Sequence, residues 1–242
     1  MTANERPVQI SVVYDNTAQD SRLTADWGFS CFVEGIESPI LFDTGGDGAI
    51  LLTNLEKLGI QPKDVKILFL SHIHWDHVGG VDAFLAQNGH VEVFAPHSFP
   101  EEFKNSIQAA GALVREVEDP VTVCTGTHST GELGNALIEQ SLVVETAQGL
   151  VVITGCAHPG IVEIVRAVKS RFGDEIYLVL GGFHLLDLSE EEIREIIREF
   201  RNLGVKRVAP CHCTGERAIQ LFEADYGENF VKLGAGARIS IE

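Results

Sequence analysis

Apolar and β-branched residues recur in short runs along most of the chain, and glycine, aspartate or other turn-forming residues separate these runs. Short runs bounded by turn residues are typical of buried β-strands. The pattern therefore predicts a protein rich in sheet structure. The predicted strands cover residues 8–14, 29–33, 40–42, 67–70, 91–94, 121–124, 142–145, 151–154, 176–180 and 205–209.

Stretches with the apolar periodicity of an amphipathic helix lie between several predicted strands. The clearest covers residues 190–203, where Ser189 and Glu192 form a capping box at the start and Gly204 provides the stop. Strands that alternate with helices, without an internal repeat or a Pro/Ser-rich linker, predict a mixed α/β fold. We expect one domain that spans residues 1–242. The other predicted helices are 49–58, 81–87, 160–172 and 216–222.

The composition and charge narrow the classes of partner. Hydrophobic residues make up 45% and charged residues 22% of the 242 positions, which is typical of a compact soluble protein with a sizeable core. The formal net charge of −17 argues against nucleic acid and anionic lipid surfaces, because both attract basic residues that neutralise phosphates. We therefore expect a small-molecule substrate, while nothing in the sequence indicates an oligomeric state.

The N-terminal region and the cysteines bear on the cellular compartment. Residues 1–16 lack the basic region followed by an apolar region that marks a secretion signal. No apolar run approaches the length of a membrane span. The five cysteines are an odd number in a chain of this size, which does not need disulfides, so reduced thiols are expected. These features favour a cytoplasmic protein.

The strongest chemical signal is the run His72-Ile73-His74-Trp75-Asp76-His77, which directly follows a predicted strand. In extended backbone, residues two apart point to the same side, so His72 and His74 can offer their imidazoles to one ion. Asp76 and His77 project in other directions, which suits a second ion beside the first. Neutral imidazole and carboxylate ligands suit zinc, with iron or manganese as alternatives. The competing interpretation is a polar loop with a helix-capping aspartate and solvated histidines, which the spacing disfavours.

The pattern His-x-His-x-Asp-His after a strand resembles the signature of the metallo-β-lactamase superfamily. This resemblance implies a four-layer αββα sandwich within the α/β (α+β) class. Asp43 resembles the strand-end aspartate that orients the metal loop from behind the ligands, with a turn aspartate as the alternative. His158 resembles the third histidine of the first metal site, and His212 the last ligand of the second. Either histidine alone would more often be a packed or capping residue, but placement at strand ends favours ligation.

The chain departs from the family pattern at Gly181-Gly182, where the superfamily usually presents a Gly-Asp pair whose carboxylate bridges two metals. No acidic residue follows until Asp187. His184 is a candidate ligand, proton carrier or substrate contact at this position. The resemblance therefore implies one or two zinc ions, with a weakened second site.

Cysteines lie close to two of the candidate histidines. Cys211 and Cys213 flank His212, and Cys156 lies two residues before His158. Their thiolates are alternative metal ligands, but alternate residues on a strand point the other way and small buried cysteines are common, so packing is the expected role.

Several short sequence motifs resemble those of one branch of the superfamily, classed as class-II metal-dependent hydrolases. This branch includes dihydropterin-ribofuranosylaminobenzene-phosphate synthases, which are transferases. These motifs are Asp15-Asn16, residues 155–160, residues 181–185 and residues 211–215.

Three functions are compatible with this pattern. The leading one is a metal-dependent hydrolase, in which metal-activated water attacks an ester, amide, thioester or phosphoester and Asp76 orients the nucleophile or shuttles its proton. His184 is the second candidate catalytic residue. The first alternative is a transferase that condenses a pterin pyrophosphate with an aminobenzene acceptor. The second is a non-catalytic metal-binding protein, which would close its coordination sphere with protein side chains.

Overall fold

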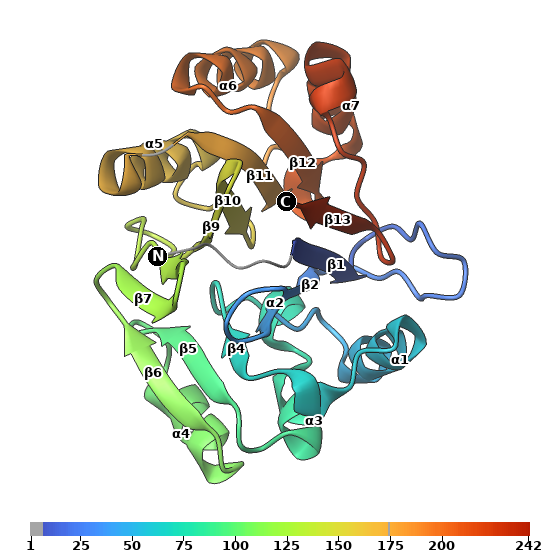
Figure 1. The fold of residues 1–242 in the computed structure, drawn as a ribbon, viewed down its shortest axis with the longest axis vertical. Coiled ribbons are helices and arrows are strands. Elements are labelled where there is room, and N and C mark those ends of the chain that lie inside the picture. The colour runs from blue at the N-terminus through green and yellow to red at the C-terminus, as the bar shows by residue number, and fades with distance from the viewer. Residues whose placement is uncertain (1–6, 174) are drawn as a thin grey trace.

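The computed structural model describes residues 7–173 and 175–242, which form two β-sheets packed face to face with helices on both outer faces (Figure 1). The first sheet has seven strands. From one edge to the other they are β13 (Arg238–Ile241), β1 (Val8–Tyr14), β2 (Ser30–Glu34), β3 (Ile40–Phe42), β4 (Ile67–Phe69), β5 (Glu92–Pro96) and β6 (Leu113–Val117).

The second sheet has six strands, and three of them run parallel to one another at one edge. In spatial order the strands are β12 (Arg207–Cys211), β11 (Ile176–Gly182), β10 (Gly149–Thr154), β9 (Leu142–Thr146), β8 (Thr127–Ser129) and β7 (Val121–Cys124).

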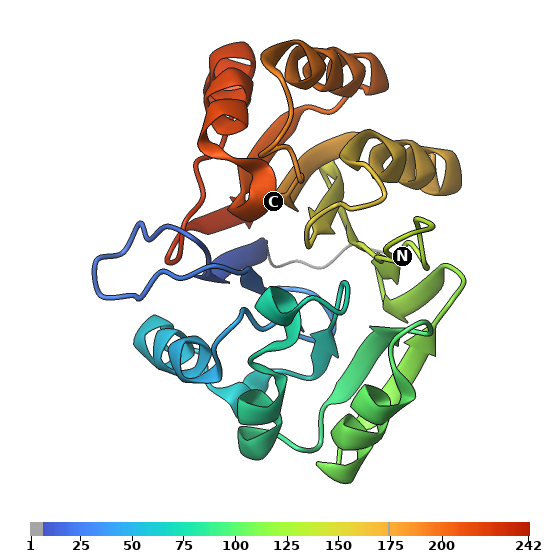
Figure 2. The ribbon, with the colours of Figure 1, turned by 180° about the vertical axis from the view of Figure 1, so that it is seen from behind.

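Helices cover the outer face of each sheet, as both ribbon views show (Figures 1 and 2). Those on the first sheet are α1 (Gly48–Leu58), α3 (Val81–Gln87) and α4 (Glu101–Ala109). Those on the second sheet are α5 (Ile161–Phe172), α6 (Glu190–Leu203) and α7 (Glu216–Tyr226). Four short elements are α2 (Trp75–Val78), η1 (Pro62–Asp64), η2 (His212–Thr214) and η3 (Gly227–Asn229).

Three apolar clusters separate the four layers. Along β3, Ile40 and Phe42 face the cluster between the sheets, whereas Leu41 faces the helices of the first sheet. Along β10, Ile153 faces the inner cluster and Val152 faces the helices of the second sheet. Successive residues of a strand point to opposite faces, so a strand buried on both sides must be apolar throughout. The predicted αββα sandwich is confirmed.

The predicted helix at 190–203 is confirmed with both of its caps. The Ser189 side chain and Glu192 form the capping box, and Gly204 ends α6 with φ 80°, a left-handed conformation that glycine adopts without steric cost. Elements with weaker apolar signals were not predicted. These are β6, β8, β13, α2 and α4.

The carboxyl ends of the parallel strands gather at one edge of the sandwich, where the chain leaves β3, β4, β10, β11 and β12. Among the described residues, the non-glycine residues with positive φ all lie in the segments that leave four of these strands. Left-handed backbone in a non-glycine residue costs free energy, so it marks segments whose conformation the surroundings dictate. These residues are Asp43, Ala157, His184 and His212.

No helix in the described part of the chain is both long enough and apolar enough to cross a lipid bilayer.

Candidate metal centre

Asp43 holds two of the candidate ligands in position from behind. Its Oδ2 lies 2.7 Å from His77 Nδ1 and accepts a hydrogen bond of 2.6 Å from Ser71 Oγ. Because Ser71 Oγ donates to Asp43, its lone pair is free to accept from His72 Nδ1 at 2.9 Å. When Asp43 is ionised, this chain of hydrogen bonds favours the tautomer with the proton of each ring on Nδ1, which leaves a lone pair on both Nε2 atoms.

Burial keeps both of these rings neutral. It is the main cause that lowers the pKa of His72 and of His77 to about 3, and neighbouring histidines lower both further. Burial also raises the pKa of Asp43 to about 8, against the opposing effects of His72 and Ser71. Neutral imidazole is the form that binds metal ions.

Glu139 orients the His158 ring in the same way that Asp43 orients the His77 ring. This fully buried carboxylate accepts hydrogen bonds from the backbone N–H groups of four consecutive residues, 155–158, and its Oε2 lies 3.1 Å from His158 Nδ1. Burial acts to raise the pKa of Glu139, but His72, His158 and the backbone donors outweigh it and hold that pKa well below its usual range. The ionised carboxylate fixes the loop after β10 and turns His158 Nε2 away from itself.

His212 is oriented by the segment after β1. Asn16 Oδ1 lies 2.9 Å from His212 Nδ1, while the Asn16 amide donates to the His212 carbonyl at 3.1 Å. Asp15 accepts from the His212 backbone N–H at 3.0 Å. On the other side of the ring, His212 Nε2 lies 3.2 Å from Asp76 Oδ2 and 3.2 Å from His77 Nε2.

The outward-facing ligand atoms fall into two adjoining groups, and in each all atoms lie within 4.8 Å of one another. The first contains His72, His158 and Cys156. The second contains Asp76, His77 and His212, again with Cys156. All of these side chains are buried except His158, which is partly buried.

The residues fit a bound cation. His72 Nε2 is fully buried and has no hydrogen-bond partner among the described residues. A buried nitrogen without a partner costs free energy, and a metal ion is a partner that its lone pair can bind. The predicted ligands His72, Asp76, His77, His158 and His212 are thus brought together, although they come from three separate stretches of sequence.

The two other candidates, His74 and His184, lie at the exposed side of this cluster. The His74 ring is 4.8 Å from that of His72 and 4.7 Å from that of His158, centroid to centroid, but its nitrogens belong to neither group. The His184 ring is 4.5 Å from that of His158, and His184 groups with Cys156 and Cys213. Ligation by His74 therefore remains a prediction, as does the role of His184.

Asp76 and His212 shift the pKa values of each other within the second group. Burial acts to raise the pKa of Asp76, but the hydrogen bond with His212 and the charges of His77 and His212 hold it well below its usual range. Burial alone would lower the pKa of His212, yet Asp76 and Cys213 raise it overall. Asp76 is therefore an ionised carboxylate at neutral pH.

The structure explains why Gly182 carries no carboxylate. A Cβ atom on Gly182 would lie 2.4 Å from the Gly155 carbonyl oxygen and 2.7 Å from Cys213 Sγ. Contacts this short do not occur, so the space that a bridging acid needs is filled by the loop after β10 and by a cysteine.

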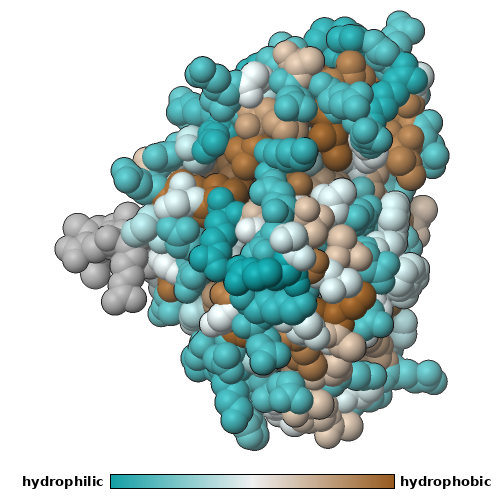
Figure 3. Space-filling view, turned by 90° about the vertical axis from the view of Figure 1, so that its right-hand side faces the viewer, coloured by the Kyte–Doolittle hydropathy of each residue, from teal (hydrophilic) through white to brown (hydrophobic). Residues whose placement is uncertain are grey.

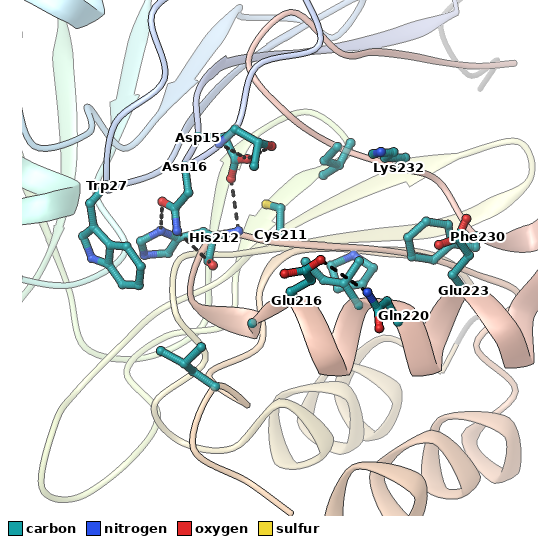
Figure 4. A pocket seen from close by; sticks show the side chains of 16 residues that line it. Asp15, Asn16, Trp27, Cys211, His212, Glu216, Gln220, Glu223, Phe230 and Lys232 are labelled. Atoms are coloured by element: carbon teal, nitrogen blue, oxygen red, sulfur yellow. Dashed lines mark hydrogen bonds between the residues drawn. The ribbon is translucent and has the colours of Figure 1, made fainter. Parts of the chain in front are cut away.

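A pocket of about 460 Å³ adjoins the cluster at His212 (Figure 4). The Trp27 and His212 rings lie beside each other at one end, with centroids 5.1 Å apart, and Phe230 and Lys232 lie toward the other end. Glu216, Gln220 and Glu223 of α7 line it as well. A pocket with aromatic walls and a few polar groups suits a small ligand.

The surface around the centre includes exposed apolar side chains. Trp27 is 41%, Trp75 61% and Leu186 59% exposed; Trp27 and Leu186 line the pocket, and Trp75 lies between His74 and Asp76 in the sequence. Figure 3 shows one face of the molecule, on which separate hydrophobic patches interrupt a largely hydrophilic surface. Apolar groups beside a polar centre favour an organic ligand.

The sequence did not point to one residue of this site and left the role of another open. Glu139 lies in no recognisable sequence motif, and it acts by accepting hydrogen bonds from the backbone of residues 155–158. Cys156 was expected to pack, with metal ligation as the alternative, and its role stays a prediction: it is buried, but its Sγ lies 3.2 Å from His77 Nε2 and it belongs to none of the three apolar clusters. Its inclusion in both ligand groups could not be read from the spacing alone.

Comparisons with known proteins identify the family of this chain. The family model described as the metallo-β-lactamase superfamily matches residues 28–212. A 7,8-dihydropterin-6-methyl-4-(β-D-ribofuranosyl)-aminobenzene-5'-phosphate synthase of Methanocaldococcus jannaschii is 30% identical, over 92% of this chain and 92% of its own. An N-acyl homoserine lactonase of Bacillus cereus is 28% identical over 69% of this chain and 75% of its own. A solved structure of a metal-dependent hydrolase of the β-lactamase superfamily is 31% identical, with a TM-score of 0.82 over 97% of this chain and 99% of that chain. The chain therefore belongs to the metallo-β-lactamase superfamily.

Proposed function

We propose that this protein is a metal-dependent hydrolase of a small-molecule ester, amide, thioester or phosphoester. One observation carries the proposal. Four histidines each place Nδ1 within hydrogen-bond distance of an oxygen atom, and each of the four belongs to one of the two ligand groups that share Cys156. This is how proteins prepare imidazoles as metal ligands. The four are His72, His77, His158 and His212.

His72 and His158, with His74 beside them, would hold one ion, and Asp76, His77 and His212 would hold a second. Zinc suits this set of nitrogen and oxygen donors, with iron or manganese as alternatives. An ion held there supplies Lewis acidity, which makes water a stronger nucleophile at neutral pH and polarises a substrate oxygen.

The side chains supply the proton transfers. Asp76 is ionised and lies at the edge of the buried cluster, so it orients the attacking water by accepting a hydrogen bond from it. Water adds to the carbon or phosphorus atom, and the bond to the leaving group breaks. His184 is exposed, and its hydrogen bond with Cys213 raises its pKa, so it can deliver a proton to the departing oxygen, nitrogen or sulfur.

The experiment is a metal titration of chelator-treated protein with zinc, iron and manganese, coupled to assays on esters, lactones, thioesters and phosphodiesters. We expect turnover of at least one substrate class that depends on added metal and is lost in His72→Ala. Metal uptake without turnover of any class would overturn the hydrolase proposal.

A transferase is the second candidate, and two observations favour it. The Methanocaldococcus jannaschii synthase matches nearly the whole length of this chain. The pocket beside His212 also offers the Trp27 ring for stacking and Lys232 for a phosphate. In this reaction an aminobenzene carbon or nitrogen attacks a pterin pyrophosphate, and pyrophosphate leaves. The test is pyrophosphate release from a pterin pyrophosphate that requires an aminobenzoate-type acceptor, and absence of pterin binding would remove this candidate.

A further inference from the structure

The sulfur of Cys156 lies at the junction of the two ligand groups. Its Sγ is 3.2 Å from His77 Nε2, and it is within 4.8 Å of ligand atoms of both the His72 group and the Asp76 group. In the described structure Cys156 is the single residue common to these two groups. Thiolate is a strong ligand of zinc and related ions.

Cys156 is not placed as a packing residue. It is 3% exposed but belongs to no apolar cluster, whereas Cys31 and Cys211 both lie in the cluster between the sheets. Its backbone is fixed, because its N–H donates to Glu139 Oε1 at 3.0 Å and the following Ala157 has φ 62°. The surroundings therefore hold the sulfur against the histidines rather than against apolar side chains.

A second observation points independently to a ligand at this place. His72 Nε2 is completely buried without a hydrogen-bond partner in the described structure, and it lies in the same group as Cys156. A carboxylate on residue 182 could not reach this space. A Cβ atom on Gly182 would lie 3.3 Å from Cys156 Cα and closer still to Gly155 and Cys213. The loop that carries Cys156 occupies that space instead.

We propose that the Cys156 thiolate is a metal ligand positioned between the two ion sites, where it takes the place of the bridging carboxylate that Gly182 lacks. Binding of the ion displaces the thiol proton to solvent, so the sulfur coordinates as a thiolate. Cys213 is the neighbouring thiol, but it groups only with Cys156 and His184, and its Sγ donates to the Cys156 carbonyl at 3.6 Å. The inference rests on the metal centre of the proposed function.

The test is spectroscopic and uses the full chain loaded with cobalt in place of the native ion. Wild-type protein is expected to show a near-ultraviolet thiolate-to-cobalt charge-transfer band. Cys156→Ser should lose the band, whereas the matched variant Cys213→Ser should keep it. Circular dichroism melting of each variant verifies that the fold is intact.

X-ray absorption of the zinc-loaded wild type gives a measurement that needs no variant. We expect a sulfur neighbour at about 2.3 Å in addition to nitrogen and oxygen neighbours at about 2.0–2.1 Å. A zinc environment of nitrogen and oxygen alone would overturn the inference, and so would loss of the cobalt band in folded Cys213→Ser together with its retention in Cys156→Ser. Failure of the wild type to bind any metal would instead overturn the proposed metal centre itself.

Discussion

His77 Nδ1 lies 2.7 Å from Asp43 Oδ2, and this contact determines which nitrogen of His77 faces the other ligands. The same carboxylate reaches His72 through the Ser71 hydroxyl. One buried residue at the end of β3 thus sets the orientation of a histidine in each of the two ligand groups. Its predicted role behind the ligands agrees with this geometry.

Replacing Asp43 with asparagine is expected to weaken metal binding about 10–100-fold, because an amide can present a donor where His77 Nδ1 needs an acceptor. Competition with a chromophoric chelator measures the affinity. Asp47→Asn is the matched control, since Asp47 caps α1 by accepting from Ala49 N–H and Ile50 N–H and contacts no candidate ligand. Equal affinities in both variants would show that Asp43 does not orient the ligands.

Glu139→Gln is expected to lower the free energy of unfolding by about 1.5–3 kcal/mol, because hydrogen bonds to a buried charge are worth more than those to a neutral amide. The amide nitrogen of glutamine would also face backbone donors of residues 155–158. Urea denaturation of the metal-free protein measures the loss. Glu132→Gln is the control, since Glu132 accepts one backbone hydrogen bond, from Ser98 at an exposed position. A midpoint shared by wild type and Glu139→Gln would contradict the assigned role.

The stability that His72 and His77 contribute to the metal-free protein is expected to be lost as the pH falls from about 6.5 toward 3, while Asp43, whose pKa is raised to about 8, acts in the opposite direction. The pKa values of His72 and His77 are lowered to about 3 in the folded state, so between these limits the unfolded chain binds more protons. Their contribution is present above the unfolded pKa and is lost on acidification. Melting temperatures at a series of pH values measure the slope.

His77→Gln should flatten this slope, whereas His90→Gln, at an exposed position, should leave it parallel to that of the wild type. Added zinc should make the wild-type loss steeper, because the ions must leave as the ligands gain protons. A slope for His77→Gln that is parallel to that of the wild type would refute the prediction.

Elements whose signals lie within their own sequence were predicted accurately, whereas elements held by distant parts of the chain were not. The bounds of β1 and α6 match the predicted ranges, because apolar periodicity and caps lie within each element. In contrast, β8 consists of Thr127, His128 and Ser129, which carry no strand signal and are held by pairing with β7 and β9 on either side. Strand pairing of this kind depends on tertiary context.

The same distinction applies to the site. The run from His72 to His77 can be recognised from the sequence, because its residues are close together and of the types that bind metals. Asn16 orients His212 across 196 residues of sequence, and Glu139 acts on a loop that begins 16 residues later. The packing of the two sheets brings Asn16 to His212, and the pairing of β9 with β10 brings Glu139 to its loop, so neither role could be assigned from spacing.

His184→Gln tests the proton transfer in the proposed hydrolysis. His184 lies on the exposed side of the cluster and belongs to neither group of buried ligands, so metal content measured by elemental analysis should equal that of the wild type. The rate on a substrate found in the hydrolysis screen should fall about 10²–10⁴-fold, the usual contribution of a general acid.

The pH profile separates this role from a structural one. The hydrogen bond with Cys213 raises the pKa of His184 above its ordinary value, so wild-type kcat should fall as the pH rises through that elevated pKa and the acid form disappears. The variant should lose this alkaline limb, because glutamine does not titrate. A variant that keeps both its metal and the wild-type pH profile would exclude His184 as the proton donor and leave the leaving group to be protonated by solvent.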